Sequence, residues 1–172
     1  MTSHSDNEQL LDDAIAVARH SPNRVRHVGA VLQPLDGGPP LRSCNTFPQG
    51  VAETEQRHEG DGRLIWMEHA ERNAIFAAAR AGRSTAGAVL ASSYFPCTDC
   101  ARAIIQAGIR QLVTLPPDLA DPVWGASFGP SRTMLLEAGV QLHYSPRDAA
   151  SAQASTMAPL QVPEPAMVKA AR

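Results

Sequence analysis

The stretch AGAVLASSYFPCTDCARAIIQAGIRQLVTL, residues 86–115, carries the clearest fold signal in the chain. Short apolar runs at its two ends, over 86–92 and 109–115, predict buried strands. Between them, residues 97–107 predict a helix that stops at Gly108. A strand, a helix and a strand in this order predict two parallel strands that are joined by a helical crossover.

The same patterns predict further elements on both sides of this unit. They are a helix over 6–20, a strand hairpin over 27–33 and 41–45, a helix over 68–81, a helix over 131–138 capped by Ser131, and a strand over 140–144. Helical crossovers make the last strands parallel, whereas the hairpin is antiparallel. We therefore predict an α/β fold of three layers, α/β/α, with a mixed five-stranded sheet and helices on both faces.

In two segments the hydrophobic residues do not follow the spacing of a helix or a strand. Residues 46–67 are polar and charged, which predicts a long loop, and loops of that length in a compact domain are often functional. From Ser145 onward the chain is rich in alanine and proline and has no aromatic residue. We therefore expect one domain over residues 1–144, followed by a disordered or loosely docked tail over residues 145–172.

Composition narrows the class of protein. The 172 residues suit one domain, and 44% hydrophobic with 19% charged residues is typical of a soluble globular protein. The net charge of −2 argues against a sequence-independent nucleic-acid binder. No apolar run approaches the roughly 20 residues that span a bilayer, and the N-terminus lacks the features of a secretory signal. Three cysteines cannot all pair, so we expect a reducing, cytoplasmic location.

The residues that indicate chemistry are His69, Glu71, Cys97 and Cys100. Two thiolates and one imidazole are standard zinc ligands, and three protein ligands with an open fourth position describe a catalytic site. The two-residue gap lets both cysteines bind one ion from the first turn of a helix. If His69 also begins a helix, both helix N-termini point at the metal and favour thiolate over thiol.

Each motif has an alternative interpretation when it stands alone. A single C-x-x-C in a cytoplasmic protein can be a redox pair or half of a structural zinc site. A single His-x-Glu occurs by chance in many helices. Together, in this order, they match the H-x-E…P-C-x-x-C signature of zinc deaminases, in which the glutamate is the general acid and base and not a ligand. We therefore expect one catalytic zinc ion per chain, held by His69, Cys97 and Cys100, with Glu71 as the catalytic residue.

On these residues the chain resembles the cytidine/deoxycytidylate deaminase superfamily over about residues 8–144. It is most similar to the deoxycytidylate branch. The local features that carry this similarity are Val28-Gly29-Ala30-Val31, Asn45-Thr46-Phe47-Pro48-Gln49-Gly50, His69-Ala70-Glu71-Arg72-Asn73-Ala74-Ile75 and the stretch over 100–109. The chain departs from the branch before Asn45, where it has Ser43-Cys44.

The resemblance implies hydrolytic deamination of a small-molecule substrate, an aminated pyrimidine nucleotide or nucleoside of the deoxycytidylate or cytidine type. Zinc-bound hydroxide attacks the ring carbon that bears the amino group, and Glu71 shuttles the protons. Asn45 and Ala70 are substrate contacts by similarity, although Asn45 can equally be a turn residue. A homo-oligomer is also implied.

Several alternatives stay open at this point. The substrate can be a free base or a related heterocycle of the guanine, cytosine or triazine type. The chain can also be a non-catalytic, zinc-stabilised scaffold, but a structural site has no use for Glu71. Candidate phosphate ligands are Arg24, Arg26 and His27 before the first strand, and Arg57, His58 and Arg63 in the 46–67 loop; His58 is also a conceivable second metal ligand. The aromatic candidates for stacking on a flat ring are Phe47, Trp66, Trp124 and Phe128.

Overall fold

A computed structural model describes residues 4–147 and 149–157 and has a mixed five-stranded sheet at its centre. The strands are β1 (Gly29–Gln33), β2 (Leu41–Cys44), β3 (Val89–Ser92), β4 (Gln111–Thr114) and β5 (Gln141–Tyr144), in the spatial order β2-β1-β3-β4-β5. β1 is antiparallel to β2 and β3, whereas β3, β4 and β5 run parallel. The predicted α/β fold with a mixed five-stranded sheet is therefore confirmed.

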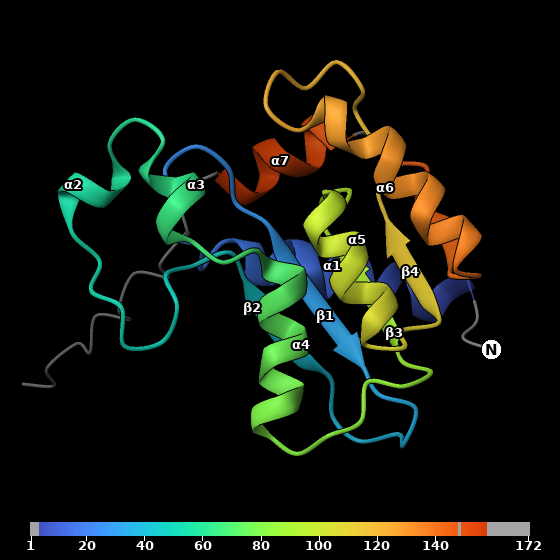
Figure 1. The fold of residues 1–172 in the computed structure, drawn as a ribbon. Coiled ribbons are helices and arrows are strands. Elements are labelled where there is room, and N and C mark those ends of the chain that lie inside the picture. The colour runs from blue at the N-terminus through green and yellow to red at the C-terminus, as the bar shows by residue number, and fades with distance from the viewer. Residues whose placement is uncertain (1–3, 148, 158–172) are drawn as a thin grey trace, which may run out of the picture.

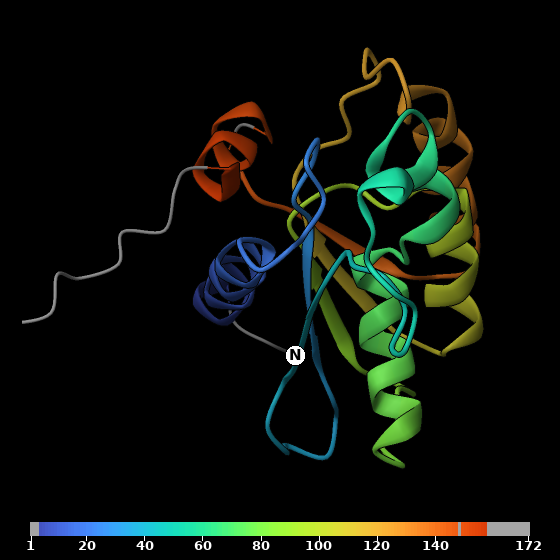
Figure 2. The same ribbon diagram turned by 90° about the vertical axis from the view of Figure 1, so that its left-hand side faces the viewer.

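Helices cover both faces of this sheet. One face carries α1 (His4–Ala18) and α7 (Ala149–Met157), and the other carries α4 (Ala70–Arg80), α5 (Thr98–Gln106) and α6 (Gly125–Glu137) (Figure 2). Two short helices, α2 (Glu55–His58) and α3 (Gly62–Trp66), lie beside the start of α4 (Figure 1). No helix among the described residues is long and apolar enough to cross a membrane.

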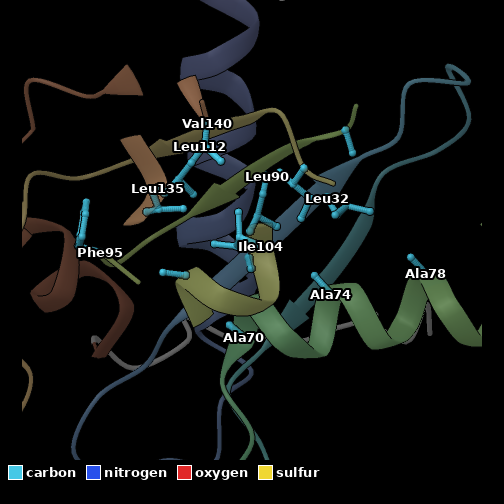
Figure 3. Packing of buried hydrophobic residues seen from close by; sticks show 14 of the residues in the cluster. Leu32, Ala70, Ala74, Ala78, Leu90, Phe95, Ile104, Leu112, Leu135 and Val140 are labelled. Carbon is cyan, nitrogen blue, oxygen red and sulfur yellow. The ribbon is translucent and has the colours of Figure 1, made fainter. Parts of the chain in front are cut away.

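The strands form two cores because successive side chains point to opposite faces of a sheet. Leu32, Leu90 and Leu112 pack in the larger cluster, which also holds Ala70 and Ala74 of α4, Ile104 of α5 and Leu135 of α6 (Figure 3). Their neighbours Val31, Ala91 and Val113 pack in a second cluster with Leu11 and Ala14 of α1. Strands buried on both faces explain the continuous apolar runs in the sequence.

Gly29 allows α1 to lie directly against β1. A Cβ atom added at this position would be 2.0 Å from the carbonyl oxygen of Ala14 and 2.7 Å from the backbone nitrogen of Ala18. No side chain fits between these backbones. The glycine therefore brings the first helix onto the sheet at the point where the chain enters β1.

Two segments differ from the sequence prediction. The predicted loop over 46–67 contains the short helices α2 and α3. α6 begins at Gly125 and not near Ser131, and it continues through Pro130. Ser131 is therefore not a cap; it lies inside α6, is fully buried, and donates a 2.7 Å hydrogen bond to the carbonyl oxygen of Pro96. This bond fixes α6 to the residue that precedes Cys97.

The first part of the expected tail forms a helix. Residues 149–157 form α7, and Ala152 of this helix is buried in the same cluster as Leu11 of α1. Before the helix, Arg147 forms an ion pair with Glu8 at 3.0 Å. Residues 149–157 therefore pack on the domain, and the rest of the expected tail, residues 158–172, lies outside the described residues.

Candidate metal centre and substrate cleft

The structure brings His69, Cys97 and Cys100 together at the N-terminal ends of α4 and α5. His69 is the residue before the first turn of α4, and Cys97 holds the same position in α5. Both have extended backbone conformations, so their side chains are free to turn toward the helix axes. Cys100 follows in the first turn of α5. The predicted origin of the ligands from two different helix starts is therefore observed.

The donor atoms are spaced as a zinc site requires. Nδ1 of His69 lies 3.5 Å from Sγ of Cys97 and 3.4 Å from Sγ of Cys100, and the three ligand atoms all lie within 4.8 Å of one another. Tetrahedral zinc has bonds of about 2.3 Å to sulfur and about 2.1 Å to nitrogen, so a sulfur ligand and a nitrogen ligand lie about 3.6 Å apart. His69, Cys97 and Cys100 are thus positioned to bind one metal ion and leave a fourth position open.

The surroundings favour the thiolate, metal-binding form of Cys97, whereas its hydrogen bond with Cys97 and its burial raise the pKa of the Cys100 thiol. Cys97 is 5% exposed and Cys100 is fully buried. The pKa of Cys97 is lowered to about 4, chiefly by its hydrogen bond with the Cys100 thiol and further by the neighbouring His69. The free backbone N–H groups at the helix start act in the same direction. A thiolate is the form that binds zinc.

Glu71 lies beside the three candidate ligands. It occupies the first turn of α4, is 3% exposed, and its Oε2 is 3.5 Å from Sγ of Cys100. Burial raises the pKa of the Glu71 carboxyl above its usual range. A raised pKa makes this carboxylate a stronger base than that of an ordinary glutamate, and a general base must first accept the proton that it later releases.

Two other sequence candidates do not join this centre. His58 forms a 3.0 Å contact with Glu53 and packs edge-to-face on Phe47. Cys44 lies apart from the ligand group and is half-buried. Among residues 4–147 and 149–157, His69, Cys97 and Cys100 are the only set of three or more such side chains with converging ligand atoms.

A cleft opens above the candidate metal ligands and contains both predicted substrate contacts. Its wall includes Asn45, Ala70 and Glu71, the apolar and aromatic side chains of Val28, Met67, Tyr94, Phe95, Trp124 and Phe128, and the cations Arg26 and Arg63. Trp124 also packs edge-to-face on the imidazole of His69, with 5.0 Å between the ring centroids. A mostly apolar pocket with a few convergent polar groups is the usual form of a small-molecule site.

Asn45 has a structural role in the cleft wall. Its Oδ1 accepts a 2.8 Å hydrogen bond from the backbone N–H of Val28, and its Nδ2 donates a 2.9 Å bond to the carbonyl oxygen of Arg26. The amide therefore holds the chain that leads into β1. One N–H and one lone pair remain for a ligand, so substrate contact by Asn45 stays a prediction.

The candidate phosphate ligands separate into two groups. Arg26 and Arg63 line the cleft. Arg24 instead forms a two-bond ion pair with Glu55 on the exposed surface, at 2.8 and 2.7 Å. Nδ1 of His27 lies 2.9 Å from the carbonyl oxygen of Thr156. Arg57 stacks on Trp66, with 3.9 Å from the guanidinium carbon to the ring centroid. The structure therefore separates Arg24 from Arg26, and phosphate binding by any of these residues stays a prediction.

Two residues at the cleft wall were not singled out by the sequence analysis. Tyr94 lines the cleft, and its hydroxyl donates a 2.8 Å hydrogen bond to Asp121. Asp121 lies in the segment between β4 and α6 and also pairs with Arg26. Neither residue belongs to a motif, and Arg26 and Asp121 are 95 positions apart. No local sequence pattern could have revealed this contact.

The residues of this site fall within a region that matches a known protein family. The model for the cytidine and deoxycytidylate deaminase zinc-binding region matches residues 4–115, which include all three candidate ligands and Glu71. The chain belongs to the cytidine and deoxycytidylate deaminase family. This deaminase is 34% identical to an uncharacterised deaminase of Aliivibrio fischeri over 106 residues, which are 60% of this chain and 69% of the relative.

Two further comparisons define the range of the similarity. The deaminase is 33% identical over 124 residues to a probable deoxycytidylate deaminase of Drosophila melanogaster, covering 70% of this chain and 56% of that protein. The dCMP deaminase of cyanophage S-TIM5, solved in complex with dCMP and dUMP, superposes with a TM-score of 0.67 at 22% identity, over 84% of this chain and 100% of that one. This superposition shows a shared fold.

Proposed function

We propose that this protein catalyses the hydrolytic deamination of an aminated pyrimidine nucleotide of the deoxycytidylate type. The observation that carries the proposal is the buried carboxyl group of Glu71 beside the candidate ligands His69, Cys97 and Cys100, at the base of a cleft. The 33% identity to the Drosophila protein that is named a probable deoxycytidylate deaminase supports the choice of substrate.

A zinc ion held by His69, Cys97 and Cys100 would activate a water molecule for attack on the ring carbon that bears the amino group. Glu71 accepts a proton from the attacking water and delivers it to the ring nitrogen. It then transfers the second proton to the amino group, which leaves as ammonia while the carbonyl group forms. Its raised pKa suits both directions of transfer, because the carboxyl group is alternately base and acid.

The cleft wall suits the rest of such a substrate. The half-buried Trp124 offers aromatic surface to a flat pyrimidine ring, whereas Phe128 is packed in the core behind the cleft wall. Asn45 has one N–H and one lone pair left for the sugar or the base. Arg26 and Arg63 bring two guanidinium groups to the same cleft, and guanidinium groups are well suited to bind phosphate. Arg63 has no ion-pair partner among the residues that the structure describes.

Ammonia release by the zinc-loaded protein tests the proposal. The substrates are dCMP, deoxycytidine and cytosine, with dAMP as a purine control. We expect dCMP to be used with the highest kcat/KM, since only dCMP engages both the ring-binding and the cationic parts of the cleft. Preference for a free base, or no ammonia release from any aminated pyrimidine, would overturn the proposal.

Two further properties stay predictions. The fold leaves large apolar side chains exposed, among them Ile65, Phe76 and Leu119. We predict that part of this surface is buried in a homo-oligomer, which light scattering of the purified protein would test. A cytoplasmic location is predicted from the three free cysteines, and cell fractionation would test it.

A further inference from the structure

Arg26, Tyr94 and Asp121 form a connected group at one wall of the cleft. Nη2 of Arg26 lies 2.5 Å from Oδ2 of Asp121, and the guanidinium carbon lies 4.5 Å from the centroid of the Tyr94 ring. The Tyr94 hydroxyl donates to the same Oδ2 atom at 2.8 Å. The three residues come from the segments before β1, after β3 and after β4, so only the folded chain assembles them.

Both carboxylate oxygens of Asp121 accept two hydrogen bonds each. Oδ1 accepts hydrogen bonds from the backbone N–H groups of Val123 at 2.9 Å and Trp124 at 2.7 Å, and Oδ2 accepts from Arg26 and Tyr94. The side chain is 3% exposed. A carboxylate with four donors is held rigidly and stays ionised. Asp121 does not line the cleft itself, so it can act on a ligand only through the residues that it holds.

One atom of this group has no partner. Nη1 of Arg26 is buried, and no described residue accepts a hydrogen bond from it. Burying a guanidinium N–H without an acceptor is costly, and such groups in a native site call for a ligand or a water molecule. Arg26 lines the cleft, so an oxygen atom of a bound ligand can supply the missing acceptor.

We propose that Asp121 is a positioning residue, which fixes the guanidinium group of Arg26 so that Nη1 is presented to an anionic oxygen of the substrate. This inference rests on the proposed function, because it assigns the phosphate end of the proposed substrate to Arg26. Asp121 binds one edge of the guanidinium, Tyr94 supports its face, and the other edge is left for the ligand. Arg26 thereby becomes pre-organised, and less conformational entropy is lost on binding.

The charge of Asp121 gives the proposal a distinctive test. If Asp121 only neutralised Arg26, its removal would strengthen phosphate binding, because one negative charge near the phosphate would be lost. If Asp121 positions Arg26, its removal lets the guanidinium turn toward solvent and weakens phosphate binding. Asp121→Asn separates these outcomes, since the amide oxygen can still accept from Val123 and Trp124 while the amide nitrogen cannot accept from Arg26.

The experiment measures KM and kcat for dCMP and for deoxycytidine in zinc-loaded wild-type, Asp121→Asn, Arg26→Gln and the double variant. We expect each single variant to raise the KM for dCMP by about 10- to 100-fold, the range for a lost hydrogen bond to a charged group. The kcat for dCMP and both constants for deoxycytidine stay near wild-type values. The double variant should be no worse than Arg26→Gln, because the two residues act as one unit.

Arg24→Gln is the matched control, since Arg24 is two positions from Arg26 but pairs with Glu55 outside the cleft. Tyr94→Phe keeps the ring under Arg26 and removes one hydrogen bond to Asp121, so its effect should be smaller. Calorimetric binding of dUMP gives a second readout that needs no turnover. Its affinity should fall in parallel with the rise in KM.

The outcomes separate this inference from the proposed function. A lower KM for dCMP in Asp121→Asn, or additive effects in the double variant, would overturn the positioning role while deamination stands. An equal loss of kcat/KM for dCMP and for deoxycytidine would show a general structural defect. That result would also overturn the positioning role. If the wild-type protein released no ammonia from either compound, the proposed function itself would be wrong, and dUMP binding would then decide whether Arg26 still binds a phosphate.

Discussion

Sγ of Cys100 lies 3.4 Å from Nδ1 of His69, although the two residues belong to different helices and are 31 positions apart. Cys97 completes the group, so a metal ion held by these three residues would join α4 to α5. Cys97→Ser should reduce bound zinc from about one ion per chain to well below that value, because the hydroxyl is a far poorer zinc ligand than a thiolate. Metal analysis by mass spectrometry after dialysis measures this. Cys44→Ser is the control and should retain zinc; full retention by Cys97→Ser would contradict the site.

Glu71 is the residue whose loss should separate catalysis from folding. Glu71→Gln keeps the size of the side chain but cannot take a proton from water, so kcat should fall by about 10²- to 10⁴-fold or more. Zinc content and the thermal unfolding temperature should stay close to wild type. Glu137→Gln, at an exposed position of α6, serves as the control. Wild-type turnover by Glu71→Gln would remove Glu71 from the mechanism.

The buried pair of Arg26 and Asp121 predicts a pH dependence of stability. The pKa of Asp121 is lowered from 3.8 to about 2 by the backbone N–H of Trp124, the Tyr94 hydroxyl and Arg26, which together outweigh its burial. Because the pKa is lower in the folded state, the stabilisation is complete above about pH 5 and is lost as the pH falls toward 2.

A shift of this size corresponds to about 2 kcal/mol. The difference in free energy of unfolding between wild type and Asp121→Asn should therefore be largest at neutral pH and should shrink between about pH 5 and pH 2. Urea denaturation at a series of pH values measures it. A constant difference over this range would show that Asp121 is not ionised in the way described.

Gly29 should be intolerant of any side chain. Gly29→Ala places a Cβ atom 2.0 Å from the carbonyl oxygen of Ala14, so α1 must move off β1. We expect the free energy of unfolding to fall by about 1–3 kcal/mol or more in denaturant titrations. Gly129→Ala in α6 is the control, since its Cβ meets nothing within 4 Å, and alanine there should stabilise the helix by about 1 kcal/mol. An equal change in the free energy of unfolding for Gly29→Ala and Gly129→Ala would refute the close contact between Gly29 and α1.

Helix α7 should contribute to stability through its buried side. Ala152 packs in the cluster formed with α1, whereas Ala154 of the same helix is exposed. Ala152→Glu buries an unpaired charge and should lower the thermal unfolding temperature by several degrees, whereas Ala154→Glu should leave it nearly unchanged. If both variants unfold at the same temperature, α7 is not docked on α1 as described.

The strands, three of the helices and the candidate metal ligands could be predicted from the sequence alone. Apolar runs such as 86–92 and 109–115 indicate buried strands because both faces of the sheet are covered. The spacing of Cys97 and Cys100 indicates one site because a single helical turn brings both sulfur atoms to one ion. His69 and Glu71 could be added because the chemistry of the motif requires an imidazole and a proton carrier together.

Helices without a strong local signal were found only in the folded chain. Gly125, Gly129 and Pro130 are residues that usually interrupt helices, yet α6 runs through them because Phe128 and Leu135 are buried in the larger core. The Ala- and Pro-rich composition after Ser145 predicts a tail, yet packing on α1 stabilises α7. In these segments, tertiary burial outweighs intrinsic propensity.

Arg24 and Arg26 are equivalent in the sequence, since both are arginines just before the first strand. Tertiary structure alone distinguishes them: one meets Glu55 on the surface, and the other meets Asp121 and Tyr94 in the cleft. Local periodicity describes which face of an element is apolar, but it carries no information on which distant segment will lie against that face. The contact between Arg26 and Asp121 depends on the packing of β1, β3 and α6, and is therefore decided only when the sheet and its helices are assembled.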